Sequence, residues 1–175
     1  MKKILFLSAL VFACPSARAA GLTVEQSKLT LGEVLFYSMP TGDAGDALKG
    51  SLGFGVYGDY AIQDNIKVGL ETGYIFGYDV KGGSSDKVTV FNIGPTAKYF
   101  ITQDKVTYYG VAGLGMYRSS FDAGSSTDLG LSLGGGATCE FDKNWAAGAE
   151  LRYTHVGGDF DSDFINLGFK LDYKF

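Results

Sequence analysis

The segment Leu167–Phe175, LGFKLDYKF, has an apolar residue at every second position and a glycine or charged residue at the positions between. Side chains of a β-strand alternate between its two faces, so one face of this strand is apolar and the other carries Gly168, Lys170 and Asp172. The same period of two recurs through the chain, and after the first 20 residues no stretch keeps a helical period. The sequence therefore predicts an all-β fold.

Seven further segments alternate in this way, which gives eight strands. They cover residues 28–39, 51–62, 66–76, 91–101, 108–117, 129–141, 145–154 and 164–175. In the first of them Glu33 shares a face with Leu29 and Leu31. Either Glu33 lies near a rim, or a bulge at Gly32 changes the facing of the residues that follow.

The connections alternate in length. Short turns are expected at 63–65, 102–105 and 142–144, and longer loops rich in Gly, Ser and Asp at 40–50, 79–86, 121–128 and 157–163. An even number of strands with short turns on one side is typical of bacterial outer-membrane barrels, whose turns and termini face the periplasm. Since an open sheet edge is not tolerated in lipid, we expect a closed antiparallel eight-stranded up-and-down transmembrane β-barrel.

Period two alone does not distinguish this barrel from a soluble, lipocalin-like one with its apolar face inside. Glycine favours the membrane barrel, because Gly at alternate positions suits a narrow lumen and is depleted on exposed strand faces. Charged residues share the glycine face, five of each sign, and must pair if they are buried there. We therefore expect a salt-bridge network that fills the lumen, made by Asp59, Lys67, Glu71, Lys98, Glu140, Glu150, Arg152, Lys170, Asp172 and Lys174.

Aromatic residues lie near the strand ends, where two girdles would meet the lipid headgroups. The girdle beside the short turns is expected to contain Tyr60, Tyr99, Tyr108, Phe141, Trp145, Tyr173 and Phe175. The girdle toward the loops is expected to contain Tyr37, Phe76, Tyr153 and Phe164.

Residues 1–19 have the pattern of a cleaved secretory signal peptide, with Lys2 and Lys3 before an apolar run and a small-residue triplet that ends at Ala19. The remaining residues, 20–175, form one barrel domain. The 15 basic residues of the chain, less the three in the signal, leave 12 against 19 acidic residues, a net charge of −7. This balance argues against a nucleic-acid partner. Cys139 is then the one remaining cysteine, so no disulfide framework is expected.

The segments NIGPTAKYF (92–100), YYGVAGLGMYR (108–118), DLGLSLGGGATCEF (128–141) and NWAAGAELRYTHV (144–156), with the ending LGFKLDYKF, resemble small outer-membrane barrels of the OmpX and Ail kind and the OmpA-type barrel domain. The resemblance covers about Leu52 to Phe175. It implies insertion by the barrel-assembly machinery, with Tyr173 and Phe175 in the assembly signal. A peptidoglycan-binding domain after the barrel is not expected, and the loops, although longer than the turns, are short.

Catalytic and metal sites are weakly indicated. His155 is the only histidine, and the position two residues later, where barrel lipid A deacylases have a serine, is Gly157. Asp159, Asp161 and Asp163 alternate in the last loop, but the glycine and bidentate glutamate of a calcium loop are missing. The sequence predicts no enzyme, no cofactor and no metal.

The preferred hypothesis is a structural and surface-interaction protein of the outer membrane. Its expected partners are outer-membrane lipid and lipopolysaccharide. The alternative is a narrow channel or carrier for small apolar solutes of the OmpW type, and a third hypothesis is a lipid A hydrolase that depends on His155.

Overall fold

The fold is described by a computed structural model of residues 25–82, 86–103, 105–121, 124–158 and 161–175. The predicted signal peptide lies outside these residues. The elements are η1 (Gln26–Lys28), β1 (Leu29–Thr41), α1 (Gly42–Ala47), β2 (Ser51–Gln63), β3 (Ile66–Asp79), β4 (Lys87–Gln103), β5 (Val106–Phe121), β6 (Gly124–Glu140), β7 (Trp145–Val156) and β8 (Ser162–Lys174). Neither helix in the described part of the chain has the length and hydrophobicity to cross a membrane.

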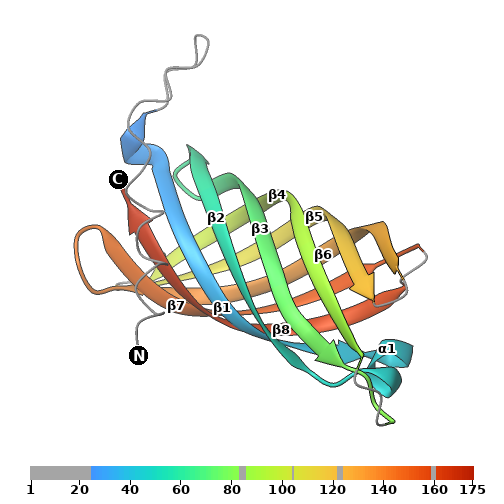
Figure 1. Ribbon diagram of the computed structural model, residues 1–175. Coiled ribbons are helices and arrows are strands. Elements are labelled where there is room, and N and C mark those ends of the chain that lie inside the picture. The colour runs from blue at the N-terminus through green and yellow to red at the C-terminus, as the bar shows by residue number, and fades with distance from the viewer. Residues whose placement is uncertain (1–24, 83–85, 104, 122–123, 159–160) are drawn as a thin grey trace, which may run out of the picture.

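The eight strands form a closed barrel in which each strand pairs with its sequence neighbours. All pairs are antiparallel, and β1 closes the barrel against β8 from Thr30↔Lys174 to Thr41↔Asp163. The predicted fold class is therefore confirmed. Figure 1 shows Phe175 and the short turns at one end of the barrel, which we call the turn end, and α1 at the opposite, loop end.

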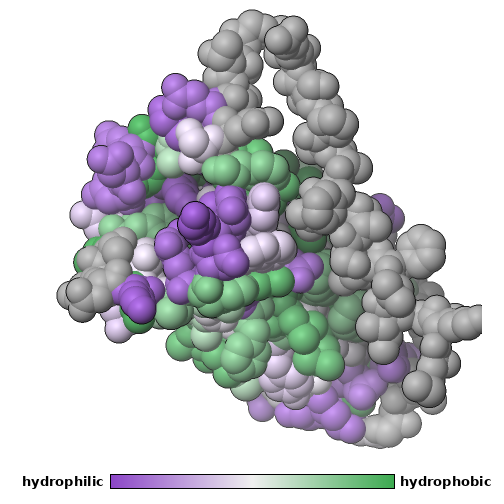
Figure 2. Space-filling model, turned by 90° about the vertical axis from the view of Figure 1, so that its left-hand side faces the viewer, coloured by the Kyte–Doolittle hydropathy of each residue, from purple (hydrophilic) through white to green (hydrophobic). Residues whose placement is uncertain are grey.

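The apolar row of each strand points outward. On β6, Leu129, Leu131 and Leu133 are each about three-fifths exposed, whereas Gly130 and Ser132 between them are buried. Figure 2 views the molecule from the side of the turn end, where hydrophilic residues gather near the centre and hydrophobic residues lie around them. A continuous apolar outer wall of this kind requires a nonpolar surrounding.

The first strand has no bulge. The register from Leu29↔Tyr60 to Ser38↔Ser51 is continuous, so Glu33 lies on the outward face beside Leu31 and Leu35. Of the two interpretations of Gly32, the bulge is wrong.

Two loop predictions are also corrected. The predicted loop 40–50 contains α1, and in the predicted loop 121–128 the strands β5 and β6 continue to Phe121 and Gly124. Ser125, Ser126 and Thr127 pair with β5 although their composition is typical of a loop.

Interior glycines make room for interior tyrosines. Gly32 faces Tyr57 across the β1–β2 pair, and Gly136 faces Tyr109 across the β5–β6 pair. A Cβ atom at Gly136 would lie 2.6 Å from the Tyr109 hydroxyl and 2.8 Å from its Cζ. The glycine-rich face therefore allows large rings to lie flat across a narrow lumen.

Candidate functional site

The lumen is the candidate functional site, and its turn-end half contains buried ion pairs. Lys98 Nζ lies 2.6 Å from Asp59 Oδ2, and both residues are almost fully buried. The same ammonium lies 3.9 Å from the centroid of the Tyr57 ring. Pairing and contact with the ring offset the cost of burying this lysine.

A second lysine shares the Tyr57 ring. Lys170 Nζ lies 3.2 Å from Glu150 Oε2, and its distances to the ring centroids of Tyr57 and Tyr109 are 4.3 and 4.8 Å. Both ammonium groups therefore lie near the Tyr57 ring, and the Tyr57 hydroxyl donates to Asp172. Attraction of each cation to the ring offsets part of the repulsion between them.

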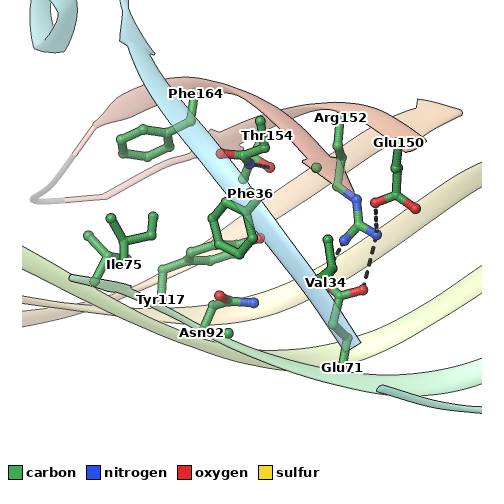
Figure 3. Close-up of a pocket in the computed structure, with 14 residues that line it drawn as sticks. Val34, Phe36, Glu71, Ile75, Asn92, Tyr117, Glu150, Arg152, Thr154 and Phe164 are labelled. Atoms are coloured by element: carbon green, nitrogen blue, oxygen red, sulfur yellow. Dashed lines mark hydrogen bonds and ion pairs between the residues drawn. The ribbon is translucent and has the colours of Figure 1, made fainter. Parts of the chain in front are cut away.

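Arg152 links two buried carboxylates. Its Nη1 and Nη2 atoms bind the two oxygens of Glu71 at 2.6 and 3.0 Å, and Nη2 also lies 2.6 Å from Glu150 Oε1. Tyr109 donates to Glu150 Oε2 at 2.8 Å. Figure 3 shows Arg152 and Glu150 on one side of the lumen and Glu71 across from them. The two-pronged contact with Glu71 fixes the guanidinium between strands β3 and β7.

Three predicted charged residues lie closer to the turn end. Lys67 donates to Thr30 Oγ1 at 2.9 Å and lies 5.1 Å from the Phe100 ring centroid. Lys174 pairs with Glu140, whose side chain is half exposed. Glu140 is therefore at the mouth of the barrel, whereas the expectation was an interior position.

Tyr57 and Tyr109 are functional residues that the charge-based analysis missed. Both are buried and both donate a hydrogen bond to a network carboxylate. A signal for them exists in the sequence, because both lie on the glycine face of their strands. Large aromatic residues on an otherwise small and polar face indicate side chains that fill the lumen.

The loop-end half of the lumen is apolar, which the sequence analysis did not predict. We call this cluster the loop-end plug; it consists of Leu48, Ile75, Tyr78, Val88, Val90, Val156 and Phe164. Tyr78 stacks on Phe164 with ring centroids 5.6 Å apart, and its hydroxyl bonds to that of Ser38 at 2.6 Å. Phe164 was expected in the outer girdle, but it points inward and is almost fully buried.

A strap of backbone hydrogen bonds lies over the plug. Leu48 and Val80 form an isolated β-bridge between the loops after β1 and β3. Lys49 N donates to Asp79 O at 2.9 Å, and Lys81 N donates to Ala47 O at 2.7 Å. These bonds hold Leu48 in the plug.

A small cavity lies between the ionic layer and the plug. Arg152, Glu71 and Asn92 line it on the polar side, and Phe36, Ile75 and Phe164 on the apolar side (Figure 3). It is the space left where the two differently filled halves of the lumen meet.

The predicted turn-end girdle lies on the outer wall, where Tyr99, Tyr108 and Phe141 are about half or more exposed. Trp145, Tyr173 and Phe175 form a cluster in which the Trp145–Tyr173 and Tyr173–Phe175 ring centroids are each 4.9 Å apart. Tyr60 is half-buried on the same face.

His155 lies on the outer wall at the loop end. Its Nδ1 atom is 2.8 Å from Asp163 Oδ1, which also accepts a bond of 2.7 Å from the Tyr153 hydroxyl. Asp159, one of the three alternating acidic residues of the last loop, lies outside the described residues, and Asp163 is engaged by His155 and Tyr153. The position two residues after His155 on the chain is Gly157, which offers no nucleophile.

The closed barrel with this outward apolar wall agrees with the comparison with known families. A family model described as the outer membrane protein beta-barrel domain matches residues 5–175. The chain belongs to this family. It is an outer-membrane β-barrel protein, and the family resemblance stated from the sequence is confirmed. No curated protein is similar enough in sequence to match it.

Solved structures share the fold at low sequence identity. Neisserial surface protein A superposes with a TM-score of 0.69 at 20% identity, over 85% of this chain and 98% of that one. Ail, the attachment invasion locus protein of Yersinia pestis, in complex with the heparin analogue sucrose octasulfate, gives 0.56 at 17% identity, over 84% and 96%. The outer membrane enzyme PagL gives 0.52 at 11% identity, over 83% and 99%. A surface protein and an enzyme share this barrel, so the fold alone does not decide activity.

Proposed function

We propose that this protein is a non-catalytic structural and surface-interaction barrel that contributes to envelope integrity or contact through its loop end. The observation that carries the proposal is the double obstruction of the lumen. Arg152 with Glu71 and Glu150, which we call the Arg152 layer, and the loop-end plug lie in series along the barrel axis, so a solute that crosses must displace both.

The two obstructions resist different solutes. A hydrated ion that reaches the plug would exchange water for the rings of Tyr78 and Phe164, which costs several kcal/mol for an unpaired charge. An apolar solute that passes the plug would meet buried ion pairs. Such a solute offers no partner for the charges, so separating the pairs would leave buried charges uncompensated. A filled lumen of this kind supports a scaffold function more strongly than transport.

In this proposal the loop end of the barrel faces the outside of the cell. Short turns face the periplasm in bacterial barrels, and the same orientation here puts both termini in the periplasm and presents α1 and the strap to the outside. The exposed surface is small, because the connections at this end are short. Lipopolysaccharide around the rim and a compact external ligand are the partners that it suits, and insertion by the barrel-assembly machinery is part of the proposal, with Tyr173 and Phe175 in the assembly signal.

Planar-bilayer recording tests the filled lumen. The wild-type protein is expected to give no steady conductance, and the double variant Tyr78→Ala/Phe164→Ala is expected to give at most brief openings because the Arg152 layer remains. Phe169→Ala, on the outer wall, is the matched control. A reproducible wild-type channel that is abolished by Glu71→Gln or Arg152→Met would overturn the proposal in favour of the narrow-channel alternative.

The absence of catalysis has a separate test. Purified protein mixed with lipid A is expected to leave its acyl-chain profile unchanged by mass spectrometry. Deacylation that is lost in His155→Ala would instead establish the hydrolase hypothesis.

A further inference from the structure

One carboxylate lies on the lipid-facing wall. Glu33 shares the outward row of β1 with Leu31 and Leu35, and its register partners on either side are Val56 and Leu171, both apolar. The other charged residues that point outward from the described strands lie near the loop end: Asp79, Lys87, Arg118, His155 and Asp163. Glu33 is therefore isolated within the apolar belt.

Nothing in the described part of the chain pairs with this carboxylate. Thr72 offers a contrast, since it also points outward but donates its hydroxyl proton to Asn92 O at 3.0 Å. A polar group that faces hydrocarbon without a partner carries a cost that a bound donor would remove. No residue that the structure describes supplies that donor.

The position of Glu33 along the membrane normal restricts which partner can reach it. Leu171, its neighbour on β8, precedes Tyr173 by two residues, or about 7 Å along the strand and about 5 Å along the membrane normal at a 45° tilt. Tyr173 pairs with Leu31, so Tyr173 is the diagonal neighbour of Glu33 on the same face. The carboxylate can therefore reach the headgroup layer at the turn end beside the Trp145–Tyr173–Phe175 cluster.

We propose that Glu33 and this aromatic cluster form a headgroup site for an aminophospholipid, with the carboxylate accepting hydrogen bonds from a primary ammonium. A carboxylate beside electron-rich rings is complementary to an organic cation, because the rings add cation–π attraction. The position in the membrane interface favours a lipid over a soluble amine. The site lies on the outer wall and does not depend on whether the lumen conducts.

The chemistry discriminates between headgroups of equal charge. Phosphatidylethanolamine and phosphatidylcholine are both zwitterionic, but only the ethanolamine ammonium has N–H donors for Glu33. The rings attract both cations, so the carboxylate alone supplies the preference. One charge-assisted hydrogen bond corresponds to about a tenfold difference in affinity.

Native mass spectrometry of the folded full chain in detergent, titrated with each lipid, measures this preference as the dissociation constant of the one-lipid adduct. The wild-type protein is expected to bind phosphatidylethanolamine about tenfold more tightly than phosphatidylcholine, with mono- and dimethylated ethanolamine lipids between them. Glu33→Leu, which removes both acceptor oxygens, should bind all four lipids equally. Glu140→Gln, which changes a carboxylate at the turn end that already pairs with Lys174, should keep the preference.

Each outcome decides the proposal once heat-modifiable gel mobility shows that the variants are folded. Loss of the preference in Glu33→Leu and its retention in Glu140→Gln support it. A wild-type protein without preference, or a preference that survives Glu33→Leu, overturns it. A protein dimer that forms without added lipid and is lost in Glu33→Leu also overturns it, because the partner of Glu33 is then a second copy.

Discussion

Arg152→Met should be among the most destabilising substitutions in the lumen. The side chain has a similar length, but the guanidinium that binds Glu71 at 2.6 and 3.0 Å is lost. Glu150 keeps Lys170 and the Tyr109 hydroxyl, whereas Glu71 is left without its cation. Breaking a buried ion pair on one side costs about 3–5 kcal/mol of unfolding free energy.

The double variant Arg152→Met/Glu71→Gln separates this cost from a loss of packing. It removes the stranded charge as well, so it should recover about half or more of the lost stability. Lys67→Met is the control, because Lys67 bonds to a neutral hydroxyl, that of Thr30, and should cost less. Urea titration in lipid vesicles, followed by the fluorescence of Trp145, the single tryptophan, measures all three variants. An Arg152→Met variant within about 1 kcal/mol of wild type, or a double variant no more stable than the single one, would show that Glu71 does not need the Arg152 guanidinium.

Three further predictions concern the lumen. Gly136→Ala should lower stability by about 1–3 kcal/mol in the same urea titration, because its Cβ would meet the Ala149 carbonyl oxygen and the Tyr109 ring. Gly110→Ala on the open outer face should change little, and equal effects of the two substitutions would contradict the close packing at Gly136. Phe164→Ala should cost about 3–5 kcal/mol by the same measurement, and the lipid-facing Phe169→Ala less; the reverse order would show that Phe164 is not in a packed plug. Leu48→Cys/Val80→Cys in a Cys139→Ser background should form a disulfide across the β-bridge, seen as a shift on a non-reducing gel; failure to oxidise would show that the two loops do not form the strap.

The alternation of side chains carries most of what could be predicted. Residues such as Leu129, Leu131 and Leu133 alternate with small or polar ones, and a period of two assigns both the strand and its two faces. The face that points into the lumen could be predicted from its glycines. A lumen crossed by rings such as that of Tyr57 leaves no space for a Cβ at Gly32. Ion pairing of Glu71, Glu150 and Arg152 on one face could be predicted, but not which partner each one takes.

The plug could not be predicted because it depends on a change of facing. The β3–β4 register shifts between Ile75 and Tyr78, where Gly77 has φ of 132°, a conformation that other residues rarely adopt. Simple alternation puts Tyr78 outward with Phe76, and the bulge turns it into the lumen. The helix α1, GDAGDA, has no apolar period that would reveal it, and Leu48 is positioned by tertiary contacts alone.

The apolar face of the barrel is expected to touch lipid. A spin label on Leu133→Cys, in a Cys139→Ser background reconstituted in vesicles, tests it by collision with lipid-soluble oxygen and with a water-soluble nickel chelate. We expect frequent collisions with oxygen and few with nickel. A label shielded from both reagents would place Leu133 in a buried core and contradict the account.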